Sequence, residues 1–274
     1  AAPPHPPRAS RPFPPPLGEC PLPARPPPRR CPAALDLTDL SDHANEASLD
    51  ALCDLAQTAH GPVAAVCVWP RFVARARSRL DGTGIKVATV ANFPAGGQDA
   101  EAVRREVEAA VDAGADEIDV VIPWRAILDD RMESAIAVLS AGREAAGAAT
   151  LKWILETGEL RTPEAIALAS AMAIEEGGAD FLKTSTGTTD VSATPQAVEI
   201  MLDVISGSGH DCGLKVSGGV REARDAVAYL AMADEAMADF KDDDEPYWAT
   251  PARFRIGASR LRDPLILQIA AEPK

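Results

Sequence analysis

The sequence of 274 residues is short of aromatic side chains, basic residues and long apolar runs, and each shortage narrows the class of protein. Aromatic residues make up only 4% of the chain, so alanine, valine and leucine must carry the core. The 27 lysines and arginines are outnumbered by 41 acidic residues, and the net charge of -14 argues against non-specific binding to nucleic acid. No apolar run approaches the roughly 20 residues that cross a bilayer. We therefore expect no membrane anchor, and a charged chain that stays in solution.

The five cysteines and four histidines are not spaced as a disulfide framework or a metal site. The number of cysteines is odd, and no Cys-x-x-Cys pair occurs. A reducing compartment fits this usage best. The sequence therefore predicts a cytoplasmic protein without a bound metal.

Residues 1–32 are rich in proline and arginine and contain one acidic residue, Glu19. Proline removes backbone donors and fixes φ, so we expect this leader to be disordered and to lie outside the core. Runs such as Pro14-Pro15-Pro16 leave open the alternative of a polyproline ligand for a partner. The leader lacks the apolar segment of a secretory signal. We place a single folded domain at residues 33–274.

From residue 33 onward, short apolar strands alternate with helical stretches. The candidate strands are Ala33–Thr38, Val63–Val68, Ile85–Ala91, Glu117–Val121, Thr150–Glu156, Ala179–Thr184, Gly213–Ser217 and Arg253–Gly257. Between them, Thr162-Pro163 and Thr194-Pro195 are typical of helix starts, and Gly114 and Gly177 of helix ends. Eight strands that alternate with helices predict an α/β fold, the (β/α)8 TIM barrel, with a parallel sheet closed on itself.

The candidate strands carry apolar and polar side chains on opposite faces, because successive side chains alternate along a strand. The polar face holds Asp36, Thr38, Cys67, Glu117, Asp119, Lys152, Glu156, Lys183, Lys215 and Arg255. We expect this face to point toward the barrel axis, where charges of both signs must pair. Many of them fall near the strand ends that carry barrel active sites. A buried ion-pair lattice without chemistry is the alternative.

The stretch Gly178–Gly187 places a lysine near the end of a short apolar strand, before a loop of small hydroxylated residues. Burial, and Lys215 as a neighbouring cation on the next strand, would lower the pKa of the Lys183 amine. A neutral amine can form a Schiff base with a carbonyl. Asp119, with Lys152 as the cation beside it, is the candidate proton shuttle. The alternative is that Lys183 is a surface lysine that reaches solvent.

Glycine-rich loops follow the last three candidate strands, at Gly187, at Gly218-Gly219 and at Gly257-Ala258-Ser259. Free backbone N–H groups in such loops and at helix starts bind phosphate. Many barrels carry a phosphate site after their last strands. The three loops therefore predict a phosphorylated ligand.

Eight motifs follow one another along the chain: LDLT (35–38), VCVWPRF (66–72), ANFPAG (91–96), DEIDVV (116–121), LETGEL (155–160), GADFLKTSTG (178–187), GLKVSGGV (213–220) and RIGAS (255–259). Together they resemble the 2-deoxyribose-5-phosphate aldolase family, from about Leu35 to Leu261. The resemblance implies a class I aldolase, an aldehyde-lyase, on a barrel. Its reaction is the reversible cleavage of 2-deoxy-D-ribose 5-phosphate to D-glyceraldehyde 3-phosphate and acetaldehyde in deoxyribonucleotide catabolism.

The resemblance also implies roles for individual residues. Lys183 matches the Schiff-base lysine, Asp119 the acid/base carboxylate and Lys215 the second catalytic lysine. The residues implied to bind substrate or phosphate are Asp36, Thr38, Cys67, Lys152, Thr186, Gly187, Gly218, Gly219, Gly257 and Ser259. For Cys67, a small buried hydrophobe is an equally open interpretation. The family needs neither metal nor cofactor, and its members are often dimers or tetramers, so we expect a homo-oligomer by analogy.

The sequence departs from the family pattern at several positions. Thr188 stands where many relatives have lysine, and Arg260 stands where many have a second serine. Val216-Ser217 follows Lys215 where relatives often have Pro-Ala or Ala-Ala. The chain ends in AEPK, whereas some relatives end in a tyrosine that assists proton transfer. These differences concern phosphate affinity and rate more than the type of reaction.

Three other functions are compatible with the pattern. The first is a Schiff-base barrel lyase that acts on a different phosphorylated aldehyde or ketose. The second is a sugar-phosphate binder without catalysis, which would form no covalent adduct. The third is an interaction protein that acts through its proline-rich leader.

Overall fold

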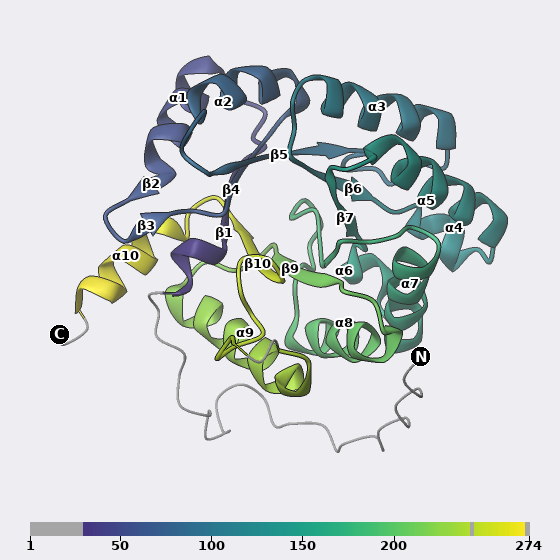
Figure 1. Cartoon of the computed structure of the whole chain (residues 1–274). Coiled ribbons are helices and arrows are strands. Elements are labelled where there is room, and N and C mark those ends of the chain that lie inside the picture. Colours follow the sequence, from purple (N-terminus) through teal and green to yellow (C-terminus); the bar gives the residue numbers. More distant parts are fainter. Residues whose placement is uncertain (1–29, 242–243, 272–274) are drawn as a thin grey trace.

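The computed structural model describes residues 30–241 and 244–271. Eight parallel strands close into a barrel in the order β1-β10-β9-β8-β7-β6-β5-β4, which confirms the predicted fold (Figure 1). The barrel strands are β1 (Leu35–Asp39), β4 (Ala65–Val68), β5 (Lys86–Ala91), β6 (Glu117–Val121), β7 (Thr150–Ile154), β8 (Phe181–Lys183), β9 (Gly213–Ser217) and β10 (Phe254–Ala258). Consecutive strands are neighbours around the ring, so side chains from adjacent motifs meet inside it.

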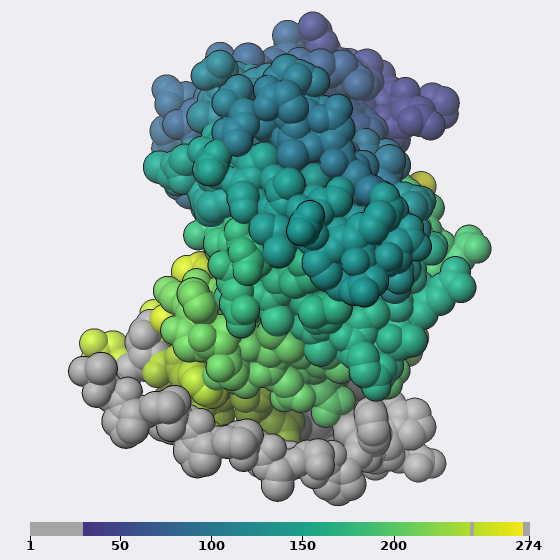
Figure 2. All heavy atoms as spheres, turned by 90° about the vertical axis from the view of Figure 1, so that its right-hand side faces the viewer, coloured from purple at the N-terminus to yellow at the C-terminus, as the bar shows by residue number. Residues whose placement is uncertain are grey.

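The helices form a layer outside the strands (Figure 1). They are α1 (Glu46–Leu55), α2 (Val73–Arg79), α3 (Ala100–Asp112), α4 (Trp124–Leu128), α5 (Met132–Ala146), α6 (Thr157–Leu160), α7 (Pro163–Glu175), α8 (Pro195–Ser208), α9 (Ala223–Ala236) and α10 (Arg262–Ala271). Short 3-10 turns lie at η2 (Pro32–Ala34), η3 (Pro70–Phe72) and η4 (Ala238–Phe240). From the side, the surface passes from blue and teal residues above to green and yellow residues below, in the order of the chain (Figure 2). None of the helices within the described ranges is long and apolar enough to cross a bilayer.

The helix signals in the sequence are largely confirmed. Thr162 and Thr194 are the N-caps of α7 and α8, and their hydroxyls accept from the N–H groups of Ala165 and Ala197. Such caps satisfy donors that the first helical turn leaves free. Gly114 ends α3 with φ +93°. After α7, the left-handed residue is Gly178 rather than Gly177.

The outward faces of the strands pack on the helices, as their alternation predicts. Trp153 of β7 is fully buried, and its indole N–H donates to the carbonyl oxygen of Gly177 at 2.9 Å. A Cβ atom on Gly142 of α5 would lie 2.6 Å from the Trp153 ring. Glycine at this position therefore allows α5 to lie directly on β7, because no side chain fits between them.

Several local elements differ from the sequence-based prediction. Ala33 and Ala34, predicted as the start of a strand, lie in the 3-10 turn η2. The strand predicted over Thr150–Glu156 ends at Ile154, because Glu156 adopts a left-handed backbone with φ 55° and leaves the strand direction. A two-stranded hairpin, β2 (Gln57–Thr58) and β3 (Gly61–Pro62), was not predicted. Strands of two residues are too short to show alternation, so the pattern could not reveal them.

The predicted leader lies outside the described residues up to Arg29, as do the last residues of the tail. Its final three residues, Arg30 to Pro32, are placed against the barrel. The Arg30 guanidinium pairs with Asp234 of α9 at 2.6 Å and donates to the Ala249 carbonyl oxygen at 2.7 Å. Cys31 is fully buried. The chain therefore contacts the folded domain before residue 33, since a short apolar side chain and a paired cation can both be accommodated there.

Candidate active site

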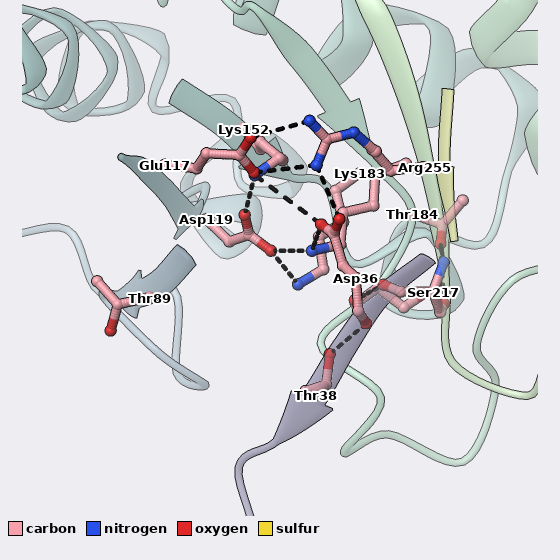
Figure 3. Close-up of polar contacts among 12 residues, drawn as sticks. Asp36, Thr38, Thr89, Glu117, Asp119, Lys152, Lys183, Thr184, Ser217 and Arg255 are labelled. Carbon is pink, nitrogen blue, oxygen red and sulfur yellow. Dashed lines mark hydrogen bonds and ion pairs between the residues drawn. The ribbon is translucent and has the colours of Figure 1, made fainter. Parts of the chain in front are cut away.

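Seven charged side chains from six strands meet inside the barrel. They are Asp36 of β1, Glu117 and Asp119 of β6, Lys152 of β7, Lys183 of β8, Lys215 of β9 and Arg255 of β10. Each is at most 7% exposed, so the polar face predicted from the alternation is the inward face for these residues. Figure 3 shows the labelled ones pointing toward one another. The register between neighbouring strands sets several of these contacts. It places Asp119 of β6 beside Lys152 of β7, and Lys183 of β8 beside Lys215 of β9.

The carboxylate of Asp119 binds three lysine ammonium groups. Its Oδ2 accepts from Nζ of Lys183 at 2.8 Å and from Nζ of Lys215 at 2.7 Å. Its Oδ1 accepts from Nζ of Lys152 at 3.1 Å. Burial alone would raise the pKa of Asp119, but the three cations hold it well below its ordinary value. Asp119 is therefore a carboxylate in this site and can accept a proton.

The other two carboxylates of the cluster, Asp36 and Glu117, each pair with at least two of the cations deeper in the barrel. Arg255 donates from Nη1 to Oδ1 of Asp36 at 2.8 Å and from Nη2 to Oε1 of Glu117 at 2.9 Å. Lys152 pairs with Glu117 at 2.5 Å, and Lys215 pairs with Oδ2 of Asp36 at 2.6 Å. Every carboxylate of the cluster thus has at least two cationic partners, which offsets the cost of removing it from water.

The cluster contains four basic groups and three carboxylates, so one positive charge is in excess if all seven are ionised. An unbalanced charge is costly where water is excluded. Burial lowers the pKa of Lys183, and the charge of Lys215 lowers it further, against the opposing pull of Asp119. The pKa of Lys152 and that of Lys215 are both raised, because their carboxylates outweigh the effect of burial. Lys183 is therefore the amine of the cluster that gives up its proton most readily.

The opposite side of the barrel interior is apolar. Ala65 and Cys67 of β4 form a separate cluster with Ala88 and Val90 of β5, and Trp69 and Phe93 pack against it. Burial raises the pKa of the Cys67 thiol, which keeps it neutral at physiological pH. The barrel interior thus has charged groups on one side and small apolar side chains on the other.

Glu156 is the exception among the residues predicted to face the axis. It lies beyond the end of β7 and contacts the loop after β8 instead of the charge cluster. Its Oε2 accepts from Oγ1 of Thr186 at 2.5 Å, and its Oε1 accepts from Oγ1 of Thr189 at 3.2 Å. The prediction was wrong for Glu156 because it assumed that the strand alternation continued to that residue.

The glycine loops after β8 and β9 adjoin one another. Gly187, Gly218 and Gly219 have φ values of +85°, +83° and +81°. A Cβ atom on Gly187 would lie 3.8 Å from the Cα atom of Gly218. The two loops are also joined by Ser217, whose hydroxyl donates to the Ser185 carbonyl oxygen at 2.6 Å. Positive φ values and close backbones are features of loops that present N–H groups to an anion.

The third loop begins at Gly257 in β10. A Cβ atom there would lie 3.0 Å from Cε of Lys215 and 2.8 Å from Cβ of Ser217, so a side chain would intrude on the charge cluster. Ser259 and Arg260 follow on the exposed rim. On the neighbouring strand β1, half-buried Thr38 donates its hydroxyl to the Asp36 carbonyl oxygen at 2.9 Å. These residues border one end of the barrel, above the charges.

Sequence analysis placed Glu117 and Arg255 on the inward face but gave them no role in the site. In the structure they hold Asp36 and Lys152 in position. The alternation of polar and apolar residues was sufficient to predict that the side chains of Glu117 and Arg255 point inward. It could not predict which charged groups they pair with. Within the described residues, no group of three or more His, Cys, Asp or Glu side chains is arranged to hold a metal ion.

Comparison with known proteins gives consistent relatives. The family model described as DeoC/LacD family aldolase matches residues 33–265. The deoxyribose-phosphate aldolase of Agrobacterium fabrum is 44% identical over 239 residues, which cover 86% of this chain and 89% of that protein. A Toxoplasma gondii ME49 structure assigned as a deoxyribose-phosphate aldolase aligns with a TM-score of 0.77 and 27% identity, over 90% of this chain and 97% of that one. The tetrameric deoxyribose phosphate aldolase of Aeropyrum pernix shares the fold, with a TM-score of 0.71, 24% identity and coverage of 89% and 92%.

Proposed function

This chain belongs to the DeoC/LacD aldolase family, and from that premise we propose that it cleaves 2-deoxy-D-ribose 5-phosphate reversibly, with Lys183 as the Schiff-base lysine. The products are D-glyceraldehyde 3-phosphate and acetaldehyde. The observation that carries the proposal is the position of the Lys183 amine, which is buried, has a lowered pKa and lies 2.8 Å from the Asp119 carboxylate.

The first step is addition of the neutral Lys183 amine to the aldehyde carbon C1 of the open-chain sugar. A proton from the relay that includes Lys215 and Asp119 converts the hydroxyl group of the adduct to water, which leaves. The product is a protonated imine, in which C1 is doubly bonded to Nζ. The positive nitrogen then draws electrons from the C2–C3 bond. The lowered pKa of Lys183 assists this step, because only the unprotonated amine has the lone pair that attacks.

Cleavage of the C2–C3 bond requires removal of the proton from the C3 hydroxyl. Asp119 accepts this proton, with Lys215 and a water molecule as the relay. The electron pair of the broken bond forms an enamine on Nζ, and C3 becomes the aldehyde carbon of glyceraldehyde 3-phosphate. Return of a proton to C2 converts the enamine to the imine of acetaldehyde, which water hydrolyses to release the product and the free amine.

The phosphate of the substrate is assigned to the loops at Thr186-Gly187, Gly218-Gly219 and Gly257-Ala258-Ser259. Their position at or after the ends of β8, β9 and β10 and the positive φ values of Gly187, Gly218 and Gly219 support the assignment. Asp36, Thr38, Cys67 and Lys152 complete the proposed pocket. The apolar wall around Cys67 suits the two-carbon aldehyde fragment, whereas the charges of β6–β10 suit the hydroxyl-bearing one.

Borohydride reduction in the presence of acetaldehyde, followed by peptide mass mapping, tests the assignment of Lys183. We expect one reduced two-carbon adduct on Lys183 and none in a Lys183→Leu variant. Lys86, an exposed lysine of β5, provides the control, since Lys86→Leu should leave the adduct unchanged. No adduct at saturating acetaldehyde would contradict the Schiff-base role and favour a binder without catalysis. An adduct without cleavage of deoxyribose 5-phosphate would indicate a lyase for another substrate.

The assembly and location of the protein are part of the same proposal. We propose a homo-oligomer, either a dimer or a tetramer, with the Aeropyrum pernix tetramer as the analogy. Light scattering coupled to size exclusion measures this directly, and a monomer at micromolar concentration would contradict it. The described thiols of Cys31, Cys53, Cys67 and Cys212 are free, which supports the proposed cytoplasmic location.

The activity is assigned to the barrel, residues 33–274, and not to the leader. We expect deletion of residues 1–29 to leave turnover unchanged, provided that the contacts of Arg30 and Cys31 are retained. Loss of activity in that variant would support a function of the proline-rich leader.

A further inference from the structure

Glu156 occupies an unusual position between the ends of β7 and β8. The backbone ladder continues past both strands, since Leu155 N–H donates to the Lys183 carbonyl oxygen at 2.9 Å and Thr157 N–H donates to that of Thr184 at 3.0 Å. Glu156 lies between these two bonds with a left-handed backbone, φ 55° and ψ 57°, and is 1% exposed. A residue with a side chain adopts this conformation at a cost, so the surrounding contacts must hold it.

The Glu156 carboxylate makes three contacts with the loop that follows Lys183. Oε2 accepts from the hydroxyl of Thr186 at 2.5 Å. Oε1 accepts from the backbone N–H of Thr186 at 3.3 Å. The hydroxyl of Thr189 lies 3.2 Å from Oε1 and 3.0 Å from the Val191 carbonyl oxygen, and it shares its one hydrogen between these two acceptors. Both ends of the loop around Gly187 are therefore bound to one buried carboxylate. Hydrogen bonds to an ionised acceptor are the stronger kind.

These contacts fix the direction of the neighbouring hydrogen bonds. The hydroxyl of Thr186 has one hydrogen, and a carboxylate oxygen can only accept, so that hydrogen points to Glu156. The hydroxyl of Thr188 lies 2.8 Å from Oγ1 of Thr186 and must then be the donor of that bond. The backbone N–H of Thr188 also points to Oγ1 of Thr186, at 3.2 Å.

The loop is held from its other side as well. Ser217 at the end of β9 donates its hydroxyl to the Ser185 carbonyl oxygen, and its N–H donates to the hydroxyl of Thr184 at 2.9 Å. Hydrogen bonds thus hold the segment 184–189 to Ser217 of β9 on one side and to Glu156, which follows β7, on the other. Glu156 makes no contact with the seven charges of the cluster that is described above, so its effect is confined to this loop.

We propose that Glu156 is a positioning residue for the phosphate end of the substrate, an inference that rests on the proposed aldolase function. It holds Thr186 and Thr189 so that the loop around Gly187 keeps the shape that receives the phosphate. It also directs the Thr188 hydroxyl to Oγ1 of Thr186, so that the loop binds the anion through the backbone N–H of Gly187 and not through that hydroxyl.

The test compares cleavage of 2-deoxyribose 5-phosphate with cleavage of unphosphorylated 2-deoxyribose in a Glu156→Gln variant. The glutamine amide has one oxygen and one NH2 group. If the NH2 group faces the Thr186 hydroxyl, two donors oppose one another, and if the oxygen faces it, the bond that Thr189 donates is lost. In either orientation the loop would lose its shape. We expect KM for the phosphorylated sugar to rise about 10-fold or more, with kcat changed less than threefold. Cleavage of the unphosphorylated sugar should stay within twofold of wild type.

Glu159→Gln is the matched control, because Glu159 is a nearby carboxylate that pairs with Arg161 at 3.6 Å and has no bond to the loop. Thr189→Val is a second variant, which removes one donor to Glu156 and leaves the carboxylate in place. It should raise KM for the phosphorylated sugar about two- to fivefold. It keeps the proposal testable if the Glu156 variant does not fold.

An equal loss for both sugars, or no change for either, in both variants would overturn the positioning role. Failure of the aldolase proposal would be visible separately, because wild type itself would then show no cleavage. Acetaldehyde carries no phosphate, so borohydride trapping on Lys183 should be unchanged in Glu156→Gln. Loss of that adduct in the folded variant would place Glu156 in the reacting part of the site and contradict the proposal.

Discussion

Lys183 and Lys215 share a single oxygen atom, because their Nζ atoms lie 2.8 Å and 2.7 Å from the same Oδ2 of Asp119. Two ammonium groups this close repel one another, and the shared carboxylate can compensate only part of the repulsion. Lys215 has a second carboxylate, Asp36, at 2.6 Å, whereas no other carboxylate pairs with Lys183 among the described residues. The pKa of Lys183 is therefore lowered and that of Lys215 is raised, so Lys183 loses its proton more readily than its neighbour.

Lys215→Leu should move the pH dependence of Schiff-base formation toward higher pH. The charge of Lys215 lowers the pKa of Lys183, so its removal raises that pKa, and the reactive neutral amine appears only at higher pH. The rate of adduct formation with acetaldehyde, measured against pH, checks the shift of the acid limb. Lys215→Arg, which keeps the charge, should shift it less. An unchanged acid limb in Lys215→Leu would contradict the charge coupling.

Asp119→Asn should separate adduct formation from turnover. Removal of the acid/base carboxylate should lower kcat by roughly 10²- to 10⁴-fold. The amine would still attack acetaldehyde, since Asp119 raises the pKa of Lys183 and its loss leaves the amine more readily neutral. Steady-state kinetics and borohydride trapping on the same preparation provide the two measurements. A variant that retains wild-type turnover would exclude Asp119 as the proton acceptor.

Asp36→Asn should lower the free energy of unfolding at neutral pH and make it depend less on pH in the acidic range. Burial opposes the charged form of Asp36, but Lys215, Arg255 and Lys152 together lower its pKa below the ordinary value of 3.8. The ionised carboxylate therefore stabilises the fold above about pH 4, and this contribution is lost as the pH falls below 3.8 toward the folded-state pKa. Loss of one partner of a buried ion pair costs about 3–5 kcal/mol.

Urea unfolding at pH 7 and at steps below pH 4 measures both effects for Asp36→Asn. Asp54→Asn is the control, since its side chain is 72% exposed and pairs only with Arg79 at the surface. Exposed pairs contribute about 0–1 kcal/mol. If the free energy of unfolding at pH 7 falls by the same small amount in both variants, the buried network does not depend on the charge of Asp36.

Gly218→Ala should impair phosphate binding and stability together. Gly218 has φ +83°, and a Cβ atom would lie 2.5 Å from Cβ of Ser192. We expect the strained backbone to lower the free energy of unfolding by about 1–3 kcal/mol. We also expect a higher KM for the phosphorylated sugar. Gly207→Ala in α8 is the matched control, because nothing lies within 4 Å of its added Cβ. That change should stabilise the helix by up to about 1 kcal/mol and leave KM unchanged.

Thr188→Lys should tighten binding of the phosphorylated sugar. Thr188 is exposed on the loop after β8, and a lysine there would bring an ammonium group toward the proposed phosphate site. We expect KM for 2-deoxyribose 5-phosphate to fall about threefold or more at low ionic strength, with the gain decreasing as salt is added. Kinetics at two salt concentrations, with unphosphorylated 2-deoxyribose as the comparison, provide the test. An equal gain for both sugars would show that the effect does not act through the phosphate.

The direction of the inward side chains could be predicted well from the sequence. Asp36, Asp119 and Lys215 each lie between apolar neighbours, and Lys183 follows apolar Leu182. Alternation along a strand is a local property of the backbone. The limit of that inference is seen at Glu156, where one left-handed residue ends the alternation. Nothing in the residue types around it signals that change of backbone, so it could not be predicted.

The sequence by itself determined the number of barrel strands, their inward faces and the stretch that carries Lys183, because these depend on periodicity and on residues next to one another in the chain. Only the tertiary structure decided that four basic groups meet three carboxylates, that Lys183 and Lys215 share one oxygen, and that Glu156 holds the loop at Thr186. Those relationships depend on distances between strands far apart in sequence. Electrostatic energy varies with such distances over a few ångströms, which residue order does not specify.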